Sequence, residues 1–93
     1  MKKLLPCVVG LGYVGLPVFV SLKKKFNTIG FDIDKDRVNN LKKCIDTNTE
    51  FSKKDLLIKN KSIFTFDEKF LKNCNFYIIT VPTPLKKNYL PQL

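Results

Sequence analysis

The chain has 93 residues, enough for one small domain, and its apolar fraction of 44% is typical of globular proteins rather than of disordered chains. Its apolar runs are far shorter than the roughly 20 residues that a membrane span requires. The net charge of +9 comes from lysine clusters spread along the chain, with Arg37 as the single arginine. Because arginine is the usual reader of bases and phosphates, nucleic-acid binding is a minor alternative.

Cysteine usage points away from a disulfide scaffold or a metal centre. Cys7, Cys44 and Cys74 are odd in number and lack close-pair spacing, and the chain has no histidine to complete a zinc site. Cys7 lies inside the first apolar run, so we expect it to pack in the core. We predict no catalytic role for these cysteines and no bound metal.

Residues 4–9 form a short, continuous apolar run that stops at Gly10, a pattern typical of a buried parallel strand. The lysine-rich start resembles a signal peptide, but a glycine-rich turn stands where a cleavage site would be expected. We therefore expect a first strand and a cytoplasmic protein. Apolar residues recur at helical spacing between residues 13 and 25, and Pro17 fits the first turn of that helix.

Further along the chain, strand and helix patterns alternate. Residues 28–31 predict a second strand, and Asp34 is placed to cap a helix with Val38, Leu41 and Ile45 on its apolar side. Residues 46–50 are polar and loop-like. Residues 52–55 resemble a capping box at the start of a further helix. A short strand is predicted at 63–66 and one helical turn at 67–71, and residues 76–81 give the strongest strand signal of the chain.

This order of elements predicts an α/β fold with a parallel sheet and right-handed crossovers. The expected architecture is Rossmann-like, and the chain holds the first half of it: about four strands with flanking helices, truncated before the second half of the sheet. A half sheet of this kind leaves apolar surface and an edge strand exposed, so we expect marginal stability or self-association into a homo-oligomer.

The turn after the first strand carries a dinucleotide-binding pattern. Gly10-Leu11-Gly12-Tyr13-Val14-Gly15 fits G-x-G-x-x-G between a strand and a helix, with an acid about twenty positions further on. Gly10 would make the tight turn, Gly12 would let a pyrophosphate approach the backbone, and Gly15 would let the helix pack closely. The first N–H groups of the helix would meet the phosphates. The alternative is a glycine turn selected for its shape alone.

Asp32 ends the second predicted strand, where a carboxylate can accept hydrogen bonds from both hydroxyls of an adenine ribose. It would repel a 2′-phosphate, so NAD is favoured over NADP. The alternative is an acid that only ends a strand or caps a helix, and we assign the cap to Asp34. Arg37 is near enough in sequence to contact the adenine side or to pair with Asp32, and an arginine here keeps NADP open as a minor option.

Val81-Pro82-Thr83-Pro84 follows the fourth predicted strand, and ligands of open α/β sheets bind outside such strand ends. The two prolines restrict the loop, and the Thr83 hydroxyl is free to bond a cofactor. The alternative is a loop that is merely rigid.

Three stretches resemble the N-terminal NAD-binding part of the UDP-glucose/GDP-mannose dehydrogenase family. They are residues 9–17, residues 29–34 followed by Arg37-Val38, and residues 78–84, and the resemblance extends in order over almost the whole chain. Residues 80–84, with Leu90-Pro91-Gln92-Leu93 after them, are most similar to the branch that oxidises UDP-N-acetylhexosamines for surface polysaccharides.

The resemblance implies that NAD is the cofactor and assigns its contacts. Gly10, Gly12, Tyr13, Val14 and Gly15 would line the pyrophosphate, Asp32 would hold the adenosine ribose with Arg37 beside it, and Thr83 would reach toward the nicotinamide half. Family members oxidise the C6 hydroxyl of a nucleotide sugar to a carboxylate with two NAD per turnover, through a thioester on a cysteine far downstream. No cysteine of this chain matches that position.

We therefore expect residues 1–93 to be the partial NAD-binding domain of a nucleotide-sugar C6 dehydrogenase, without its central and sugar-nucleotide domains. Such a piece would bind NAD weakly and would not turn over, and a UDP-sugar would bind only to a full-length protein. The alternative is a free-standing Rossmann module that senses a nucleotide without chemistry, because fold alone does not specify function. The reading frame beyond Leu93 would separate the two.

Overall fold

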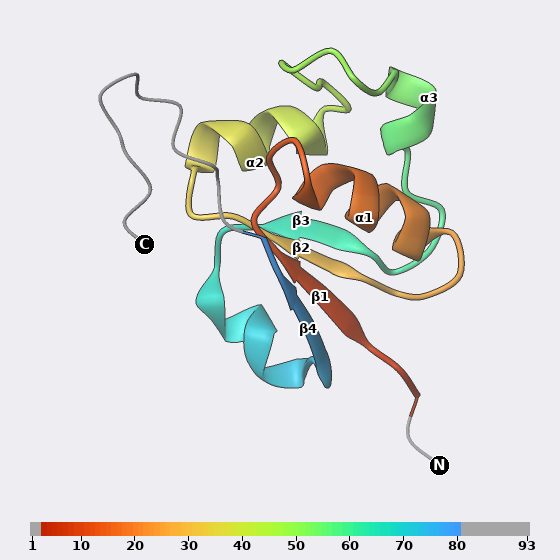
Figure 1. The fold of residues 1–93 in the computed structure, drawn as a ribbon, viewed down its shortest axis with the longest axis vertical. Coiled ribbons are helices and arrows are strands. Elements are labelled where there is room, and N and C mark those ends of the chain that lie inside the picture. The colour runs from red at the N-terminus through yellow and green to blue at the C-terminus, as the bar shows by residue number, and fades with distance from the viewer. Residues whose placement is uncertain (1–2, 81–93) are drawn as a thin grey trace, which may run out of the picture.

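A computed structural model describes residues 3–80 of the chain (Figure 1). Its strands are β1 (Pro6–Val9), β2 (Ile29–Phe31), β3 (Ile63–Thr65) and β4 (Phe76–Ile79). They form one four-stranded sheet in the order β3-β2-β1-β4, and every pairing is parallel. β1 lies between β2 and β4, so the chain crosses from one side of β1 to the other after β3. This confirms the predicted first half of a Rossmann-like sheet.

Helices cover the two faces of the sheet unequally. α1 (Gly15–Lys23), α2 (Lys35–Lys42) and α3 (Lys53–Leu56) lie on one side, and the 3₁₀ helix η1 (Glu68–Asn73) lies on the other (Figure 1). Side chains alternate along β1, so that Val8 belongs to the core under the α-helices and Cys7 to the core beside η1.

The larger core lies between the α-helices and the sheet. The rings of Phe19 from α1 and Phe64 from β3 meet there with centroids 4.6 Å apart. Its other buried members are Val8, Leu11, Leu16, Val20, Val38, Leu41 and Leu56. Leu11 anchors the loop after β1 in this core, because its side chain is wholly buried.

Two predicted helix starts are confirmed. The Asp34 side chain accepts hydrogen bonds from the backbone N–H groups of Asp36 and Arg37 at the start of α2. Ser52 and Asp55 form a reciprocal capping box at the start of α3, although aspartate replaces the usual glutamate or glutamine.

The end of the second helix differs from the expectation. α2 ends at Lys42, and Cys44 adopts a φ of 64°, the left-handed conformation that commonly terminates a helix. Ile45 therefore lies beyond the helix and is 47% exposed, so its placement on the apolar side with Val38 and Leu41 was wrong. An apolar residue at helical spacing does not extend a helix past a residue with this backbone conformation.

The boundaries of other elements also differ from the sequence patterns. α1 starts at Gly15, and Val14 before it is 61% exposed. β3 ends at Thr65, one residue before the predicted end, and the expected helical turn at 67–71 is a 3₁₀ helix that runs to Asn73. β4 ends at Ile79, while Val81, the last residue of the predicted fourth strand, lies outside the described residues.

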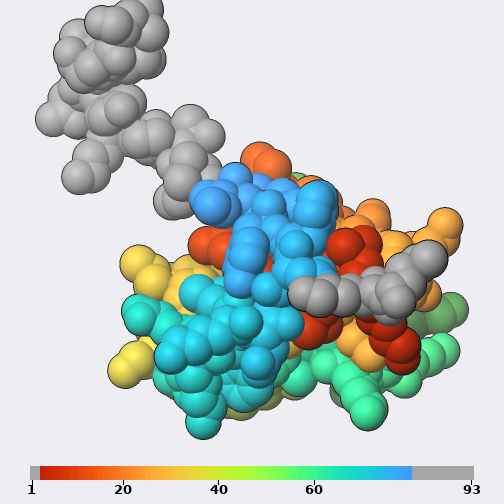
Figure 2. All heavy atoms as spheres, turned by 90° about the horizontal axis from the view of Figure 1, so that it is seen from below, coloured from red at the N-terminus to blue at the C-terminus, as the bar shows by residue number. Residues whose placement is uncertain are grey.

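β4 forms a largely uncovered side of the domain. Within residues 3–80 it pairs only with β1, and Phe76, Tyr77 and Ile79 are 48%, 46% and 69% exposed. Figure 2 shows η1 and β4, in cyan and blue, at the surface on this side of the molecule. This agrees with the apolar exposure expected for half a sheet. In the same part of the chain, none of the helices has the length and apolar character that crossing a bilayer requires.

Candidate functional site

The candidate site lies where the carboxyl ends of β2, β1 and β4 meet. Gly10 follows β1, Asp32 follows β2 and Thr80 follows β4, and these strands are neighbours in a parallel sheet. Backbone hydrogen bonds tie their ends together: Gly10 N–H donates to Phe31 O at 2.7 Å, and Thr80 N–H donates to Val9 O at 2.8 Å. The glycine-rich turn therefore starts from a fixed base at the edge where ligands of open α/β sheets bind.

Two of the glycines are required by the packing of the turn. Gly10 has a φ of +102°, and a Cβ there would lie 2.0 Å from the carbonyl oxygen of Thr80. A Cβ on Gly15 would lie 1.7 Å from the carbonyl oxygen of Gly10. No side chain fits at such distances, so the expected tight turn and close helix approach are both present. Gly15 meets the turn and the end of β4, rather than the sheet in general.

Thr80 is a part of this turn that the sequence analysis did not single out. Its hydroxyl donates a hydrogen bond to the carbonyl oxygen of Gly10 at 3.0 Å and to that of Val9 at 3.2 Å. The side chain thus fastens the end of β4 to the start of the turn. A threonine that follows a run of strand residues gives no signal for such a contact, which depends on β4 lying beside β1.

Gly12 differs from the other two glycines because it borders open space. A Cβ built on Gly12 meets nothing within 4 Å, and Tyr13 and Val14 beside it are 60% and 61% exposed. Val14 is the N-cap of α1 and makes no side-chain capping bond, and the first turn of α1 holds no acid. Leu16 N–H donates to Gly12 O at 3.1 Å and Pro17 has no N–H, so at the start of α1 the Gly15 N–H is the group left for an anion such as a diphosphate within the described residues.

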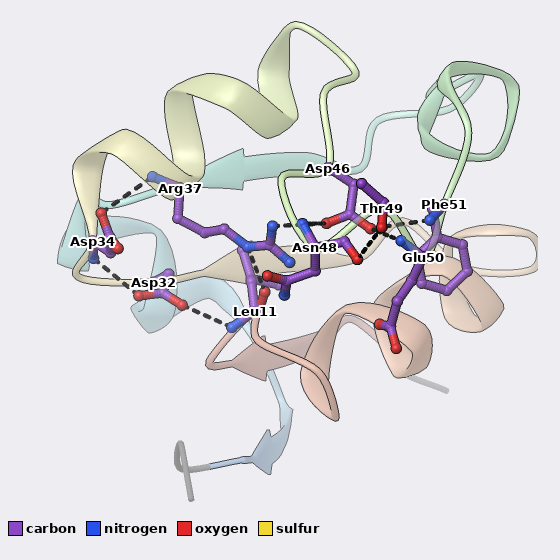
Figure 3. A network of polar contacts seen from close by, with 9 residues as sticks. All are labelled: Leu11, Asp32, Asp34, Arg37, Asp46, Asn48, Thr49, Glu50 and Phe51. Atoms are coloured by element: carbon purple, nitrogen blue, oxygen red, sulfur yellow. Dashed lines mark hydrogen bonds and ion pairs between the residues drawn. The ribbon is translucent and has the colours of Figure 1, made fainter. Parts of the chain in front are cut away.

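The Asp32 carboxylate lies directly against the turn. Its Oδ2 accepts a hydrogen bond from Leu11 N–H at 2.8 Å, and its Oδ1 accepts one from Asp34 N–H at 2.9 Å (Figure 3). Each carboxylate oxygen can accept a further bond, so capacity remains for the hydroxyls of a ribose. The structure thus brings the predicted acid and the predicted glycine turn together.

The structure places Arg37 against Leu11 and Asp46, and its expected contact with the adenine side stays a prediction. It does not pair with Asp32: its Nε donates to Leu11 O at 2.8 Å, and its Nη1 donates to the carboxylate of Asp46 at 2.8 Å (Figure 3). The guanidinium is buried, and its Nη2 has no hydrogen-bond partner among the described residues. A buried donor without a partner is costly, and Nη2 is the one polar side-chain atom that the described part of the protein leaves buried and unsatisfied.

Asp46 is the second residue that the sequence analysis missed. It stands in the polar loop after α2, yet its side chain is completely buried. It accepts hydrogen bonds from Arg37 and from the backbone N–H groups of Asn48, Glu50 and Phe51. Burial alone would raise the pKa of Asp46, but these hydrogen bonds outweigh burial and hold the pKa below its usual value. Asp46 therefore stays ionised beside Arg37.

The cysteines take no part in this site. Burial raises the pKa of Cys7 to about 12 and also raises that of Cys74, so both remain neutral thiols in the smaller core. Across the described part of the chain, no group of three or more metal-ligating side chains is gathered. The residue expected near the nicotinamide, Thr83, lies outside the described residues, and its role stays a prediction.

Open space at Gly12, the Gly15 N–H at the start of α1 and the adjacent Asp32 carboxylate together fit a dinucleotide with a diphosphate bridge and a ribose. NAD, when bound, supplies a nicotinamide ring that accepts a hydride from a substrate. The residues described here would bind and orient the adenosine and diphosphate parts of that molecule.

Comparisons with known proteins agree with this geometry. Residues 5–93 match the model of the NAD binding domain of the UDP-glucose/GDP-mannose dehydrogenase family. The chain is 43% identical to a UDP-N-acetyl-D-glucosamine 6-dehydrogenase from Pseudomonas aeruginosa, covering 100% of this chain and 22% of the relative. It is 46% identical to Protein CapL from Staphylococcus aureus, with 92% and 20% covered. A UDP-N-acetyl-D-mannosamine dehydrogenase from Methanocaldococcus jannaschii is 40% identical, with 84% and 19% covered.

The chain spans about a fifth of the length of these relatives. The match nonetheless includes nearly every residue of the chain, and the glycine turn, Asp32 and Arg37 all lie inside it. The chain therefore belongs to the UDP-glucose/GDP-mannose dehydrogenase family, as part of its NAD binding domain, and NAD is its cofactor.

Proposed function

We propose that this chain is the NAD-binding part of a dehydrogenase that oxidises the C6 hydroxyl of a UDP-N-acetylhexosamine to a carboxylate. Relatives named for UDP-N-acetyl-D-glucosamine and UDP-N-acetyl-D-mannosamine support this substrate class. The observation that carries the cofactor part is the position of Leu11, because Asp32 accepts a hydrogen bond from its N–H while the next residue, Gly12, borders open space. Substrate binding and turnover require the rest of a full-length protein.

In this proposal the glycine turn and Asp32 bind different parts of the cofactor. The backbone around Gly12 and the Gly15 N–H hold the diphosphate, and Asp32 accepts hydrogen bonds from the adenosine ribose. Arg37 is engaged with Leu11 and Asp46, so its charge is already balanced by a buried carboxylate. It is therefore poorly placed to neutralise the 2′-phosphate of NADP, which the Asp32 charge would repel.

Replacing Asp32 with asparagine tests the ribose contact. We expect Asp32→Asn to weaken NAD binding about tenfold or more, because a charged acceptor is lost, and to narrow the preference for NAD over NADP. Isothermal titration of the 93-residue chain with each dinucleotide measures both effects. Asp36→Asn is the matched control, since it removes the same charge from an exposed position in the first turn of α2. NADP affinity equal to NAD affinity in the unmodified chain would contradict this assignment.

We also propose that the chain self-associates through β4. The support is the exposed apolar side of this strand, where Ile79 is 69% exposed. Sedimentation velocity at increasing concentration should show association that Ile79→Lys reduces and that Ile33→Lys, at an 83% exposed position away from β4, leaves unchanged. A monomer at all concentrations would contradict the proposal.

A cytoplasmic location is the last part of the proposal. Its support is that the apolar run at Pro6–Val9 forms β1, a strand that pairs with a neighbour on both sides. The run is therefore part of the folded domain. Fractionation of the producing cells tests this location. Recovery of the protein in a secreted or periplasmic fraction would contradict the proposal.

A further inference from the structure

Leu11, in the middle of the glycine turn, is held through both of its peptide groups, the Gly10–Leu11 group through its N–H and the Leu11–Gly12 group through its carbonyl oxygen. Its N–H donates to Asp32 at 2.8 Å, and its carbonyl oxygen accepts from Arg37 Nε at 2.8 Å. The Leu11 side chain is wholly buried in the core. Because Gly12 follows directly, the orientation of the Leu11–Gly12 peptide determines how the turn presents its backbone to the open space. Any residue that fixes the Leu11–Gly12 peptide therefore also fixes the phosphate-binding backbone.

Arg37 could not hold the Leu11 carbonyl reliably by itself, because a long arginine side chain has considerable rotamer freedom. Asp46 removes that freedom by binding Nη1 at 2.8 Å, with side-chain exposures of 8% for Arg37 and 0% for Asp46. The carboxylate cannot rotate either, since N–H groups of Asn48, Glu50 and Phe51 donate to it at 2.9–3.0 Å. Figure 3 shows this series of contacts from the 46–51 loop through Arg37 to Leu11.

We propose that Asp46 is a positioning residue for NAD, acting through Arg37 to fix the Leu11–Gly12 peptide and hence the phosphate-binding turn. The inference rests on the proposed NAD site but gives a role to a loop that contributes no group to the turn itself. Asp32 fixes the Gly10–Leu11 peptide, Arg37 fixes the Leu11–Gly12 peptide, and Asp46 holds Arg37 in place. Loss of Asp46 would release the Leu11 carbonyl while leaving Asp32 and the glycines unchanged.

The test compares NAD affinity and folding in Asp46→Asn. An asparagine can still accept from Arg37, but its amide nitrogen would face the N–H groups of Glu50 and Phe51, so the carboxylate's fixed orientation is lost. Isothermal titration, corrected for the folded fraction from urea unfolding of the same sample, should show NAD affinity weakened about tenfold. The Gly12 amide, which shares a peptide group with the Leu11 carbonyl, should shift in ¹⁵N NMR in the absence of NAD.

Asp55→Asn serves as the matched control. Asp55 also accepts backbone and hydroxyl hydrogen bonds, from Ser52 at the start of α3, but it has no connection to Leu11. The NAD affinity of the Asp55→Asn variant, per folded molecule, should stay within about twofold of that of the unmodified chain. Equal affinity in Asp46→Asn and the unmodified chain would show that Asp46 serves stability alone and would overturn the proposal.

A double-mutant cycle tests whether the effect passes through Arg37. In Arg37→Lys, the single ammonium cannot bond Leu11 and Asp46 in the same fixed geometry, so NAD affinity should fall about as much as in Asp46→Asn. Adding Asp46→Asn to Arg37→Lys should then change affinity by less than about twofold. Full additivity of the two substitutions would overturn the proposed route.

If Asp46→Asn does not fold, Asp46→Glu takes its place, because it keeps the charge and displaces it by one methylene. We expect a smaller but measurable loss of NAD affinity, and an unchanged affinity would overturn the proposal. Failure of the unmodified chain to bind NAD would instead overturn the proposed function, and this inference with it. Tight NAD binding that is unaltered in every Asp46 variant would overturn the inference alone.

Discussion

Replacing Gly15 with alanine is expected to destabilise the domain by at least about 3 kcal/mol, a large share of what a domain of this size possesses. The reason is geometric, because the new Cβ would lie 1.7 Å from the carbonyl oxygen of Gly10 and 2.6 Å from the Thr80 hydroxyl. The carbonyl belongs to the backbone of the turn and cannot move without shifting α1. Urea unfolding followed by circular dichroism measures the change.

Gly30→Ala is the matched control for this prediction. The substitution is chemically identical, but a Cβ on Gly30 would meet side-chain atoms of Phe19 at 2.9 Å and of Leu11 at 3.2 Å. Side chains can shift by the few tenths of an ångström required, so we expect a cost of about 1 kcal/mol. An equal loss for the two glycines, or a stable Gly15→Ala domain, would show that the turn does not pack against α1 as described.

Replacing Asp46 with alanine should cost about 3–5 kcal/mol in the free energy of unfolding. The substitution leaves the Arg37 guanidinium buried without its counter-charge and removes the acceptor for the N–H groups of Asn48, Glu50 and Phe51. Asp36→Ala, which removes an exposed acid near the start of α2, should cost about 0.5 kcal/mol. Equal costs would contradict the buried network.

Acid should weaken the same network. The pKa of Asp46 in the folded domain lies below its usual value of 3.8, so the unfolded chain binds its proton more readily. The stability that this group contributes is complete above pH 3.8 and is lost as the pH falls below 3.8 through the folded-state pKa. Asp46→Asn should therefore show a flatter dependence of unfolding free energy on pH in this acid range. An unchanged pH dependence would mean that Asp46 is not paired in the folded state.

The sheet and the glycine turn could be predicted because both depend on local patterns. A continuous apolar run before Gly10, a helix after it and an acid at position 32 each act over a few residues, and the parallel topology follows from their order. The caps formed by Asp34 and Ser52 were predictable for the same reason, since each contacts N–H groups within the next three residues.

The polar network behind the turn could not be predicted in this way. Arg37 reaches Leu11 and Asp46 across 26 and 9 positions of sequence, and a buried Asp46 has the same local pattern as a solvated loop acid. Its burial depends on how the 46–51 loop closes over the guanidinium. The end of α2 was missed because the left-handed conformation of Cys44 is usually signalled by glycine or asparagine. In both cases tertiary contacts, rather than spacing, decide the structure.

Titration of Gly12→Ala with NAD tests the central claim most directly. A methyl group at Gly12 meets nothing within 4 Å in the protein, so the unfolding free energy should change by less than about 1 kcal/mol. The same methyl would occupy the space that the diphosphate needs, so NAD affinity should fall about a hundredfold or beyond detection. If Gly12→Ala folds normally and binds NAD as tightly as the unmodified chain, the glycine turn is not the diphosphate site.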